Sequence, residues 1–326
     1  MIKMCIYLSA AALLGLGNYA GAANLDCRAL QLSSAKIPDG YAGQCTTRSF
    51  SPAVGNDLRA PTDIGFTVDI LGVAPRLRDQ LYTFSIDAFA GQILRNAITP
   101  SLAGVDFSPD ASQLYAVSSE TSVSFPKWLG VIPQPSGDFI PIGALTGLPA
   151  GDSIAGFAIH PRSGIAYLAT AGGSPVLARL FTVNLVNGVT TLVGPMPAPT
   201  DPAGTIMISL AMNCEGTLIA HNISDDSLYS VNPISGATSL IGSHGLATNF
   251  AQGMDFDNTD GQLYAFLTLE TGENRFGRFN TSTAAFTTLS NNSPQGEFEG
   301  AFPGLCPPEA LLFSHGFEGE EPAVAP

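Results

Sequence analysis

The sequence predicts an all-β protein with the β-propeller architecture. Three observations support this: the composition favours strands and turns, one hairpin pattern recurs along the chain, and a second pattern lies between its copies. Only 12% of the 326 residues are charged, whereas 35 Gly and 24 Pro suit many tight turns. With 45% hydrophobic residues the chain can bury a large core, which excludes a disordered chain.

The first hairpin pattern is an apolar strand, a polar turn, and a second apolar strand. Its copies begin about 50 residues apart, a period that marks a structural repeat. The copies are GVDFSPDASQLYAV (104–117), GFAIHPRSGIAYLA (156–169), SLAMNCEGTLIAH (209–221) and GMDFDNTDGQLYAF (253–266). The segment FEGAF (298–302) matches the first strand of this pattern alone.

The second hairpin pattern alternates apolar and polar residues around a turn, as expected of a half-buried strand pair. Asn184, Asn232 and Asn280 occupy matching places in its later copies. The copies are LYTFSIDAFAGQILRNA (81–97), WLGVIPQPSGDFIPIG (128–143), LFTVNLVNGVTTLVG (180–194), LYSVNPISGATSLIG (228–242) and FGRFNTSTAAFTTLS (276–290).

Two hairpins per unit make a four-stranded blade, and a ring of blades buries sheets that are apolar on both faces. Five copies of the second hairpin predict about five blades. FEGAF then joins IGFTVDIL (64–71) and the hairpin at 81–97, so that a C-terminal strand closes the ring. Six blades are the alternative if residues 46–63 hide a weak repeat, and an open two-domain sandwich is the other structural alternative.

Residues 1–23 have the features of a signal peptide. Lys3 is followed by an apolar run from Met4 to Leu16 and by the small residues AGAA, where a signal peptidase could cut. We therefore expect an exported protein that is periplasmic, attached to the cell surface or secreted. The apolar run is too short for a membrane anchor, and no later segment reaches roughly 18 unbroken apolar residues, so no membrane span is expected.

Four cysteines remain after the leader, an even number that predicts two disulfides in an oxidising compartment. Three pairings are open. We favour Cys27 with Cys45, closing a short N-terminal loop, and Cys214 with Cys306, tying the C-terminal end to the body of the domain. A zinc site is disfavoured because no pair has C-x-x-C spacing.

The formal net charge is −14, and loss of Lys3 with the leader makes it more negative. Nucleic acid and anionic lipid are therefore poor partners, and we expect a monomer with an extracellular or envelope ligand. The predicted organisation is a signal peptide (1–23), an N-terminal disulfide-bearing extension (24–63), the β-propeller (64–306) and a C-terminal tail (307–326).

The stretch 253–266 resembles a calcium loop because three aspartates crowd before a glycine. An EF-hand loop counted from Asp255 needs Gly at its sixth position and Glu at its twelfth, where this chain has Asp260 and Phe266. The other copies of the repeat lack the acidic set. The stretch therefore predicts the turn of a hairpin, which Asp and Asn favour by bonding nearby backbone.

Two aspartates, Asp106 and Asp255, recur at the same place in the innermost strand, where other copies have Ala158 and Ala211. We expect them to face the central channel. Hydrogen-bonded or solvated channel residues are the favoured interpretation. The alternative is a pair that holds a cation.

No catalytic cluster is visible in the sequence. The four histidines lie far apart in the chain, and no H-E-x-x-H pair, G-x-S-x-G elbow or phosphate-binding glycine loop occurs. His160 belongs to a hairpin turn and His221 ends a strand. His244 is the exception, because GSHGLATNF (242–250) lies in a connection between blades, where a ligand could bind.

The repeats GVDFSPDASQLYAV and LYSVNPISGATSLIG resemble those of secreted bacterial β-propeller proteins. The resemblance covers roughly residues 80–302 and implies the fold alone. Such proteins include domains of unknown function, lactonases, quinone-dependent dehydrogenases and binding modules, so the resemblance does not select a chemistry.

The tail LLFSHGFEGEEP (311–322) resembles a short ending found on exported proteins of Gram-negative bacteria. In that case Phe313, Gly316, Phe317 and Glu318 would form a processing or sorting element, although His315 replaces the usual Asp. A flexible acidic tail whose aromatic residues dock on the body is the alternative.

The sequence thus favours an exported, non-catalytic β-propeller that acts as a binding or interaction module and needs no cofactor. The alternative is a cation-dependent hydrolase of the lactonase type, in which Asp106, Asp255 and Asn213 would hold calcium in the channel. A quinone-dependent dehydrogenase needs a His and Arg pair at the channel mouth, which the scarce basic residues disfavour.

Overall fold

A computed structural model describes residues 64–69, 80–86, 88–97, 100–122, 124–133, 137–173, 176–198, 205–249, 253–292 and 298–308. These residues form twenty β-strands and belong to one unit of the chain, residues 59–326. None of them lies in a helix, so the described part of the chain has no helix that could cross a membrane. The predicted all-β class is confirmed.

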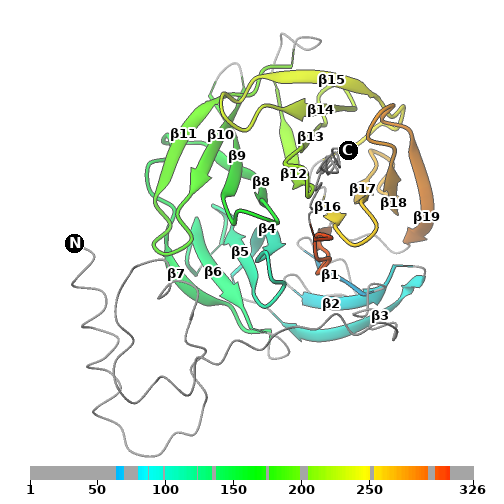
Figure 1. The fold of residues 1–326 in the computed structure, drawn as a ribbon, viewed down its shortest axis with the longest axis horizontal. Coiled ribbons are helices and arrows are strands. Elements are labelled where there is room, and N and C mark those ends of the chain that lie inside the picture. The colour runs from blue at the N-terminus through cyan, green and yellow to red at the C-terminus, as the bar shows by residue number, and fades with distance from the viewer. Residues whose placement is uncertain are drawn as a thin grey trace, which may run out of the picture. The chain divides into compact units, whose positions relative to one another are not determined.

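The strands form five four-stranded sheets in which every neighbouring pair is antiparallel (Figure 1). Four sheets keep the order of the chain. They are β4 (Leu102–Phe107), β5 (Leu114–Ser118), β6 (Trp128–Ile132) and β7 (Ile140–Ala144); β8 (Ser153–Ile159), β9 (Ala166–Gly172), β10 (Leu177–Val183) and β11 (Thr190–Pro195); β12 (Met207–Met212), β13 (Leu218–Asn222), β14 (Ser227–Val231) and β15 (Thr238–Ser243); and β16 (Gly253–Asp257), β17 (Gln262–Thr268), β18 (Asn274–Phe279) and β19 (Phe286–Asn292).

The remaining sheet combines the two ends of the described chain. Its order is β20 (Phe298–Ala301), β1 (Ile64–Asp69), β2 (Gln80–Ser85) and β3 (Ala88–Ala97). Strand β20 pairs with β1 from Phe66↔Ala301 to Asp69↔Phe298.

The innermost strands β4, β8, β12, β16 and β20 contact one another in turn, and β20 also contacts β4. The sheets therefore stand around a central axis, as Figure 1 shows in a view along it. The prediction of a β-propeller is therefore confirmed, and the alternative of an open two-domain sandwich is wrong. The segment 46–63, where a sixth blade could have hidden, lies outside the described residues.

Neighbouring blades share apolar layers. Val117 and Leu129 of the β4–β7 blade pack in one cluster with Phe157 and Leu168 of the next blade, and all four are almost fully buried. Each such side chain contributes roughly 2 kcal/mol by leaving water. The blades therefore hold together through the two apolar faces that the repeats predicted.

Glycines at the ends of the outer strands allow a close joint between blades. A Cβ on Gly143 would collide with the backbone oxygen of Asn187, and one on Gly194 would collide with that of Ser235. Both oxygens belong to the outer hairpin turn of the following blade. The glycine that ends the second hairpin pattern is thus required by the approach of this turn.

The matching asparagines shape the same outer turns. The side-chain oxygen of Asn184 accepts the amide of Val186, and that of Asn232 accepts the amide of Ile234, both at 2.8 Å. This bond to the residue two places on is the usual reason for Asn at a turn. The repeated pattern therefore encodes both sides of the joint between blades.

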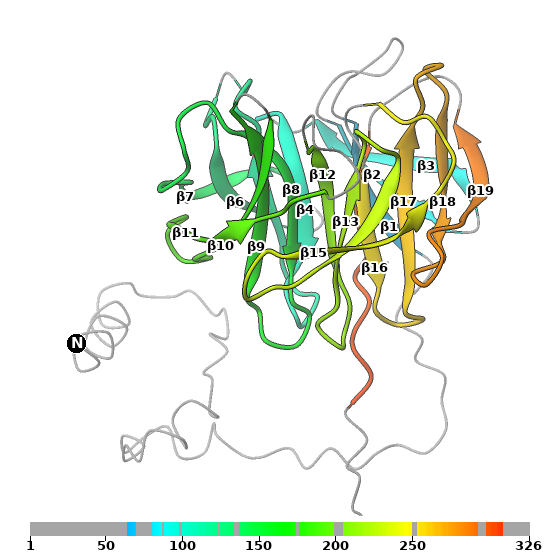
Figure 2. The ribbon, with the colours of Figure 1, turned by 90° about the horizontal axis from the view of Figure 1, so that it is seen from above.

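The chain continues after β20 across the hairpin turns of the inner strands. Gly304 lies so close to Asp257 and Asn258 that a Cβ there would collide with them. Cys306 is then bonded to Cys214, with the two Cα atoms 5.6 Å apart, which confirms the predicted pair. Figure 2 shows this segment, in red, leaving the ring below β16. Cys27 and Cys45, the signal peptide and the tail from 309 onwards lie outside the described residues.

Candidate functional site

The acidic stretch 253–266 is a β-hairpin. Its turn between β16 and β17 places Gly261 at a φ of 71°, which glycine adopts without strain. The carboxylate of Asp257 accepts the amide of Thr259 at 2.9 Å, and that of Asp260 accepts the amide of Gln262 at 2.8 Å. These carboxylates stabilise the turn by accepting hydrogen bonds from its backbone, in agreement with the interpretation favoured from the sequence.

Asp106 is a buried residue near the end of β4. One carboxylate oxygen accepts the amide of Phe107 at 2.6 Å, and the other accepts the amide of Ile159 at 2.5 Å. Ile159 belongs to β8, the inner strand of the next blade. The side chain of Asp106 therefore joins two blades.

Asp255 repeats this arrangement in β16. Its carboxylate accepts the amide of Phe256 at 2.7 Å and that of Phe302 at 2.9 Å. Phe302 directly follows β20, so Asp255 likewise reaches the neighbouring inner strand. The corresponding Ala158 and Ala211 provide no such bond. The sequence therefore distinguishes two junctions between blades, β4 with β8 and β16 with β20, from those where alanine takes the place of aspartate.

Burial controls the protonation of these two acids. It raises the pKa of Asp106 from 3.8 to about 7, although the amides of Ile159 and Phe107 act in the opposite direction. Burial also raises the pKa of Asp255 well above 3.8, and the nearby charge of Asp106 raises it further. Two negative charges are therefore unfavourable at this place.

His244 lies against a second histidine, His221, to which no sequence motif connects it. The Nε2 atoms of His221 and His244 are 2.9 Å apart, and Phe279 of β18 packs against both rings. His221 is only 1% exposed. The two histidines are far apart in the chain but meet in the fold, because β13 and β15 both pair with β14 and run in the same direction, so that their C-terminal ends lie at the same end of the sheet.

The two imidazoles have environments that favour the neutral form. Burial and the neighbouring His244 hold the pKa of His221 well below its usual value. Burial also lowers the pKa of His244, while the charges of Asp226 and Asp225 act in the opposite direction. At neutral pH one ring can then donate a hydrogen bond to the other.

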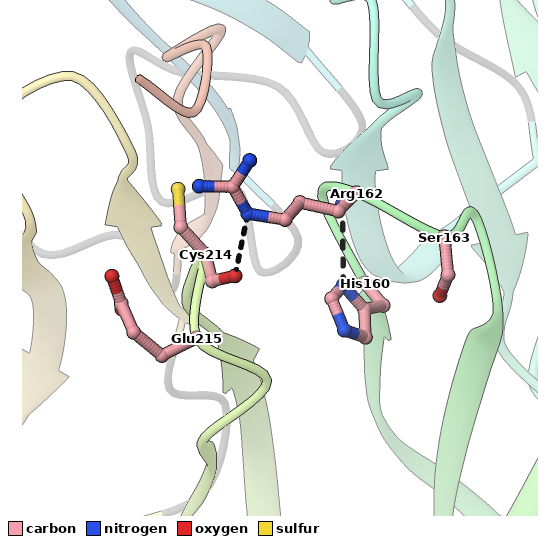
Figure 3. Close-up of a pocket in the computed structure, with 5 residues that line it drawn as sticks. All are labelled: His160, Arg162, Ser163, Cys214 and Glu215. Carbon is pink, nitrogen blue, oxygen red and sulfur yellow. Dashed lines mark hydrogen bonds between the residues drawn. The ribbon is translucent and has the colours of Figure 1, made fainter. Parts of the chain in front are cut away.

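A pocket of about 550 Å³ opens at the other end of the blades, beside the disulfide. Its walls are the turn between β8 and β9 and the turn between β12 and β13 (Figure 3). The lining residues are His160, Arg162, Ser163, Cys214 and Glu215. They stand at equivalent places in successive copies of the first hairpin pattern, so the ring places the two turns side by side.

Arg162 fixes the pocket to the C-terminal segment. Its Nε donates to the backbone oxygen of Cys214, and its Nη2 donates to that of Pro307, both at 3.0 Å. The Arg162 side chain points across the pocket in Figure 3, with Glu215 on the Cys214 side and Ser163 on the other. Partial burial and the charge of Arg162 lower the pKa of His160, so the guanidinium is the main positive charge here.

No sequence motif marks this pocket. His160 lies in a predicted hairpin turn, and Arg162 and Glu215 belong to no recognisable site pattern. The alignment of the repeat contained the necessary signal, because residues at equal positions in neighbouring blades are neighbours in space.

The described residues contain no group of three or more His, Cys, Asp or Glu side chains able to hold a metal ion. Asn213, the amide proposed alongside Asp106 and Asp255, accepts the backbone amides of Glu215 and Thr217 at 3.1 and 2.8 Å. Its oxygen therefore shapes its own turn.

Comparisons with known proteins yield structural similarity alone. No protein-family model matches the sequence, and no curated protein is significantly similar to it. A protein of unknown function from Bacteroides thetaiotaomicron is 14% identical, with 74% of this chain and 71% of that chain covered and a TM-score of 0.44. A calcium-binding protein, regucalcin, from Agrobacterium tumefaciens is 15% identical, with 71% and 70% covered and a TM-score of 0.43. A protein of unknown function from Bacteroides caccae is 13% identical, with 71% and 73% covered and a TM-score of 0.38.

Proposed function

We propose that this protein is an exported, non-catalytic β-propeller that binds an extracellular or envelope ligand at the pocket between the β8–β9 and β12–β13 turns. In this proposal the ring has five blades and is closed by β20. One observation carries it: Arg162, Ser163 and Glu215 are exposed around a cavity, whereas the acids and the amide singled out for chemistry accept backbone hydrogen bonds.

The walls of the pocket are held in place before a ligand arrives. The Cys214–Cys306 disulfide and the two hydrogen bonds of Arg162 connect three segments that are distant in sequence. A preorganised site loses little conformational entropy on binding, which favours affinity. The predicted leader and the Cys214–Cys306 disulfide support export into an oxidising compartment.

The charges of the pocket indicate a polar ligand. Arg162 offers a guanidinium with donors beyond the two it uses, Glu215 offers a carboxylate, and Ser163 offers a hydroxyl. A guanidinium pairs well with carboxylate or phosphate groups. We therefore propose a small ligand or polymer end that carries an anionic group together with other polar groups.

The test is a calorimetric and thermal-shift screen of the mature protein, from residue 24, against amino acids, sugar acids, sugar phosphates and short anionic oligosaccharides. Ser163→Trp and Glu215→Trp would fill the pocket, and Ser163→Trp also removes the long hydrogen bond, 3.4 Å, from the amide of Ile165 to the Ser163 hydroxyl. Ser282→Trp, on the exposed outer turn between β18 and β19, is the matched control. We expect a ligand whose binding falls at least tenfold in both pocket variants and stays unchanged in the control. Binding that all three variants retain would contradict the assignment.

A second candidate is a cation-dependent hydrolase of the lactonase type. The observation that favours it is the buried pair Asp106 and Asp255. A cation would offset the burial that raises both pKa values, and also the charge of Asp106 that raises the pKa of Asp255 further. Metal analysis of the purified mature protein, with lactone and ester assays in added calcium, separates the two candidates. One bound calcium per chain and turnover that Asp106→Ala abolishes would replace our proposal by this one.

A further inference from the structure

The His221–His244 contact joins a buried strand to an exposed connection. His221 lies in β13, the second strand of its blade, and His244 is the first residue after β15. The pair is at the end of the blade opposite the pocket, since β13 begins at the pocket turn and His221 lies near its other end. It is therefore independent of the proposed ligand site.

The hydrogen bonds assign the protons in the neutral pair. The Nδ1 of His244 accepts the amide of Leu246 at 3.3 Å, so the proton of the neutral His244 ring lies on Nε2. That Nε2–H then donates to the Nε2 of His221 at 2.9 Å. Both ring nitrogens of His244 thus form hydrogen bonds: Nε2 with His221 of β13, and Nδ1 with the backbone of the connection that contains His244.

Added protons are incompatible with this arrangement. A proton on His221 would place hydrogen atoms on both facing nitrogens, which then repel. A proton on His244 would go to Nδ1 and oppose the amide of Leu246. In either case one of the two hydrogen bonds of the His244 ring, to His221 of β13 or to the amide of Leu246, is lost.

The surroundings determine where a charged ring can go. On the β13–β14 turn, Asp226 and Asp225 attract a positive His244, and both are partly exposed. On β18 the ring packed against the pair is Phe279, which carries no charge. A protonated His244 is therefore favoured at the solvent side near the two acids, away from the buried His221.

The rest of the connection is held by bonds that do not involve the imidazoles. Asp226 accepts the amide of Thr248 at 2.9 Å and its hydroxyl at 2.6 Å, and Thr268 accepts the amide of Asn249 at 2.9 Å. Gly245, at a φ of 71°, lies between the pair and these anchors. The backbone amide of His244 also donates to the carbonyl oxygen of Asp226 at 3.1 Å. Loss of the imidazole contacts would therefore release the His244 ring and residues 245–246 and leave both ends of the connection attached.

We infer that His221 and His244 form a pH-operated latch, which holds the His244 ring and residues 245–246 on the blade while both rings are neutral and releases them when the pair takes up a proton. The connection between two blades is then closed at neutral pH and open in acid. In an exported protein this device would respond to the acidity of the surroundings.

Hydrogen exchange with mass spectrometry on the full mature chain tests the latch. A ring that is neutral when closed and titrates near 6.5 when open increases the open population roughly 20-fold between pH 7 and pH 5. We expect that change, after correction for intrinsic exchange rates, in peptides covering 240–249. A peptide from β9 serves as the internal reference.

Two variants isolate the pair. His221→Phe/His244→Gln contains no titratable ring at this place and should show less than a twofold change between the two pH values. His160→Gln removes a histidine whose pKa is also lowered, at the opposite end of the blades, and should keep the wild-type response. Equal protection at pH 7 and pH 5 in the wild type, or the same loss in the double variant, would overturn the inference.

A second measurement remains informative if the double variant does not fold. Proton–carbon NMR spectra of the wild-type imidazoles report the titration of each ring directly. We expect the His221 and His244 signals to shift together with amide signals of residues 244–246, below pH 6.5. Titration of either ring with no change in those amides would also overturn the latch.

Discussion

Cys214 and Cys306 are bonded to each other across a sequence separation of 92, so the segment after β20 is tied to the turn between β12 and β13. The same turn supplies one wall of the pocket. The bond therefore stabilises the described ring and the proposed binding site together.

Removal of this disulfide should destabilise the fold. For Cys214→Ser/Cys306→Ser we expect a loss of about 4 kcal/mol in the free energy of unfolding, because a long loop in the unfolded chain is no longer closed. Urea unfolding at constant pH measures the effect. Reduced wild type, in which every disulfide is opened, should be no more stable than the variant. A variant midpoint equal to that of the oxidised wild type would contradict the structural role of the bond.

Asp106 should make stability decrease as the pH rises. Its pKa is about 7 in the fold and 3.8 without the fold, so between these values the native state binds more protons than the unfolded state. Stability therefore falls with rising pH in this window, by up to about 1.4 kcal/mol per pH unit.

The variant Asp106→Asn removes that contribution, so its free energy of unfolding should fall less than that of the wild type between pH 5 and pH 7. Urea unfolding at several pH values gives the comparison. Asp110→Asn is the matched control: Asp110 lies in the adjoining turn, and its pKa is lowered by Ser108 and Ser112, outside this window. Parallel profiles for the wild type and Asp106→Asn would show that Asp106 is already ionised at pH 5.

The joint between blades should not tolerate a side chain at Gly194. In Gly194→Ala the new Cβ would collide with the carbonyl oxygen of Ser235, which belongs to the turn of the following blade. We expect a loss of about 2 kcal/mol or more, since the backbone must shift. Thr191→Ala, at an exposed position of the same strand, should change stability by less than about 0.5 kcal/mol. Thermal and urea unfolding of both variants provide the test.

Arg179 should be more important for stability than a surface arginine. Its guanidinium donates to both carboxylate oxygens of Asp152, at 2.9 and 2.8 Å, and Asp152 is only 2% exposed. Arg179→Met leaves a buried carboxylate without its cation, for which we expect a loss of about 3 kcal/mol. Arg278→Met, on the equivalent third strand of another blade but exposed, is the control. Equal unfolding midpoints for the two variants would contradict this difference.

The repeat in the sequence was sufficient to predict the blades, because strand alternation and turn residues are local features. The disulfide between Cys214 and Cys306 belongs to one of three pairings that the cysteine count leaves open, and the need to hold the chain end favours it. The hairpin turn at 253–266 followed from comparison of the copies. These predictions required no knowledge of which blades are neighbours.

The His221–His244 pair and the pocket required such knowledge. His221 and His244 meet because β13 and β15 flank β14, and neither residue has a signature that names the other. Arg162 and Cys214 meet because two turns from successive units stand side by side. The bond from Asp106 to the amide of Ile159 crosses between blades as well, so a sequence motif shows only one half of each contact.

The glycine joints have a consequence for the evolution of the ring. The β8–β11 and β12–β15 units each carry a glycine that receives the next turn and a turn that fits the previous glycine. The contacts are Gly143 with Asn187, Gly194 with Ser235 and Gly242 with Thr283. A duplicated unit would bring both complementary halves with it. Such a chain could gain or lose a whole blade by gene duplication or deletion, because the contact between neighbouring blades would stay the same.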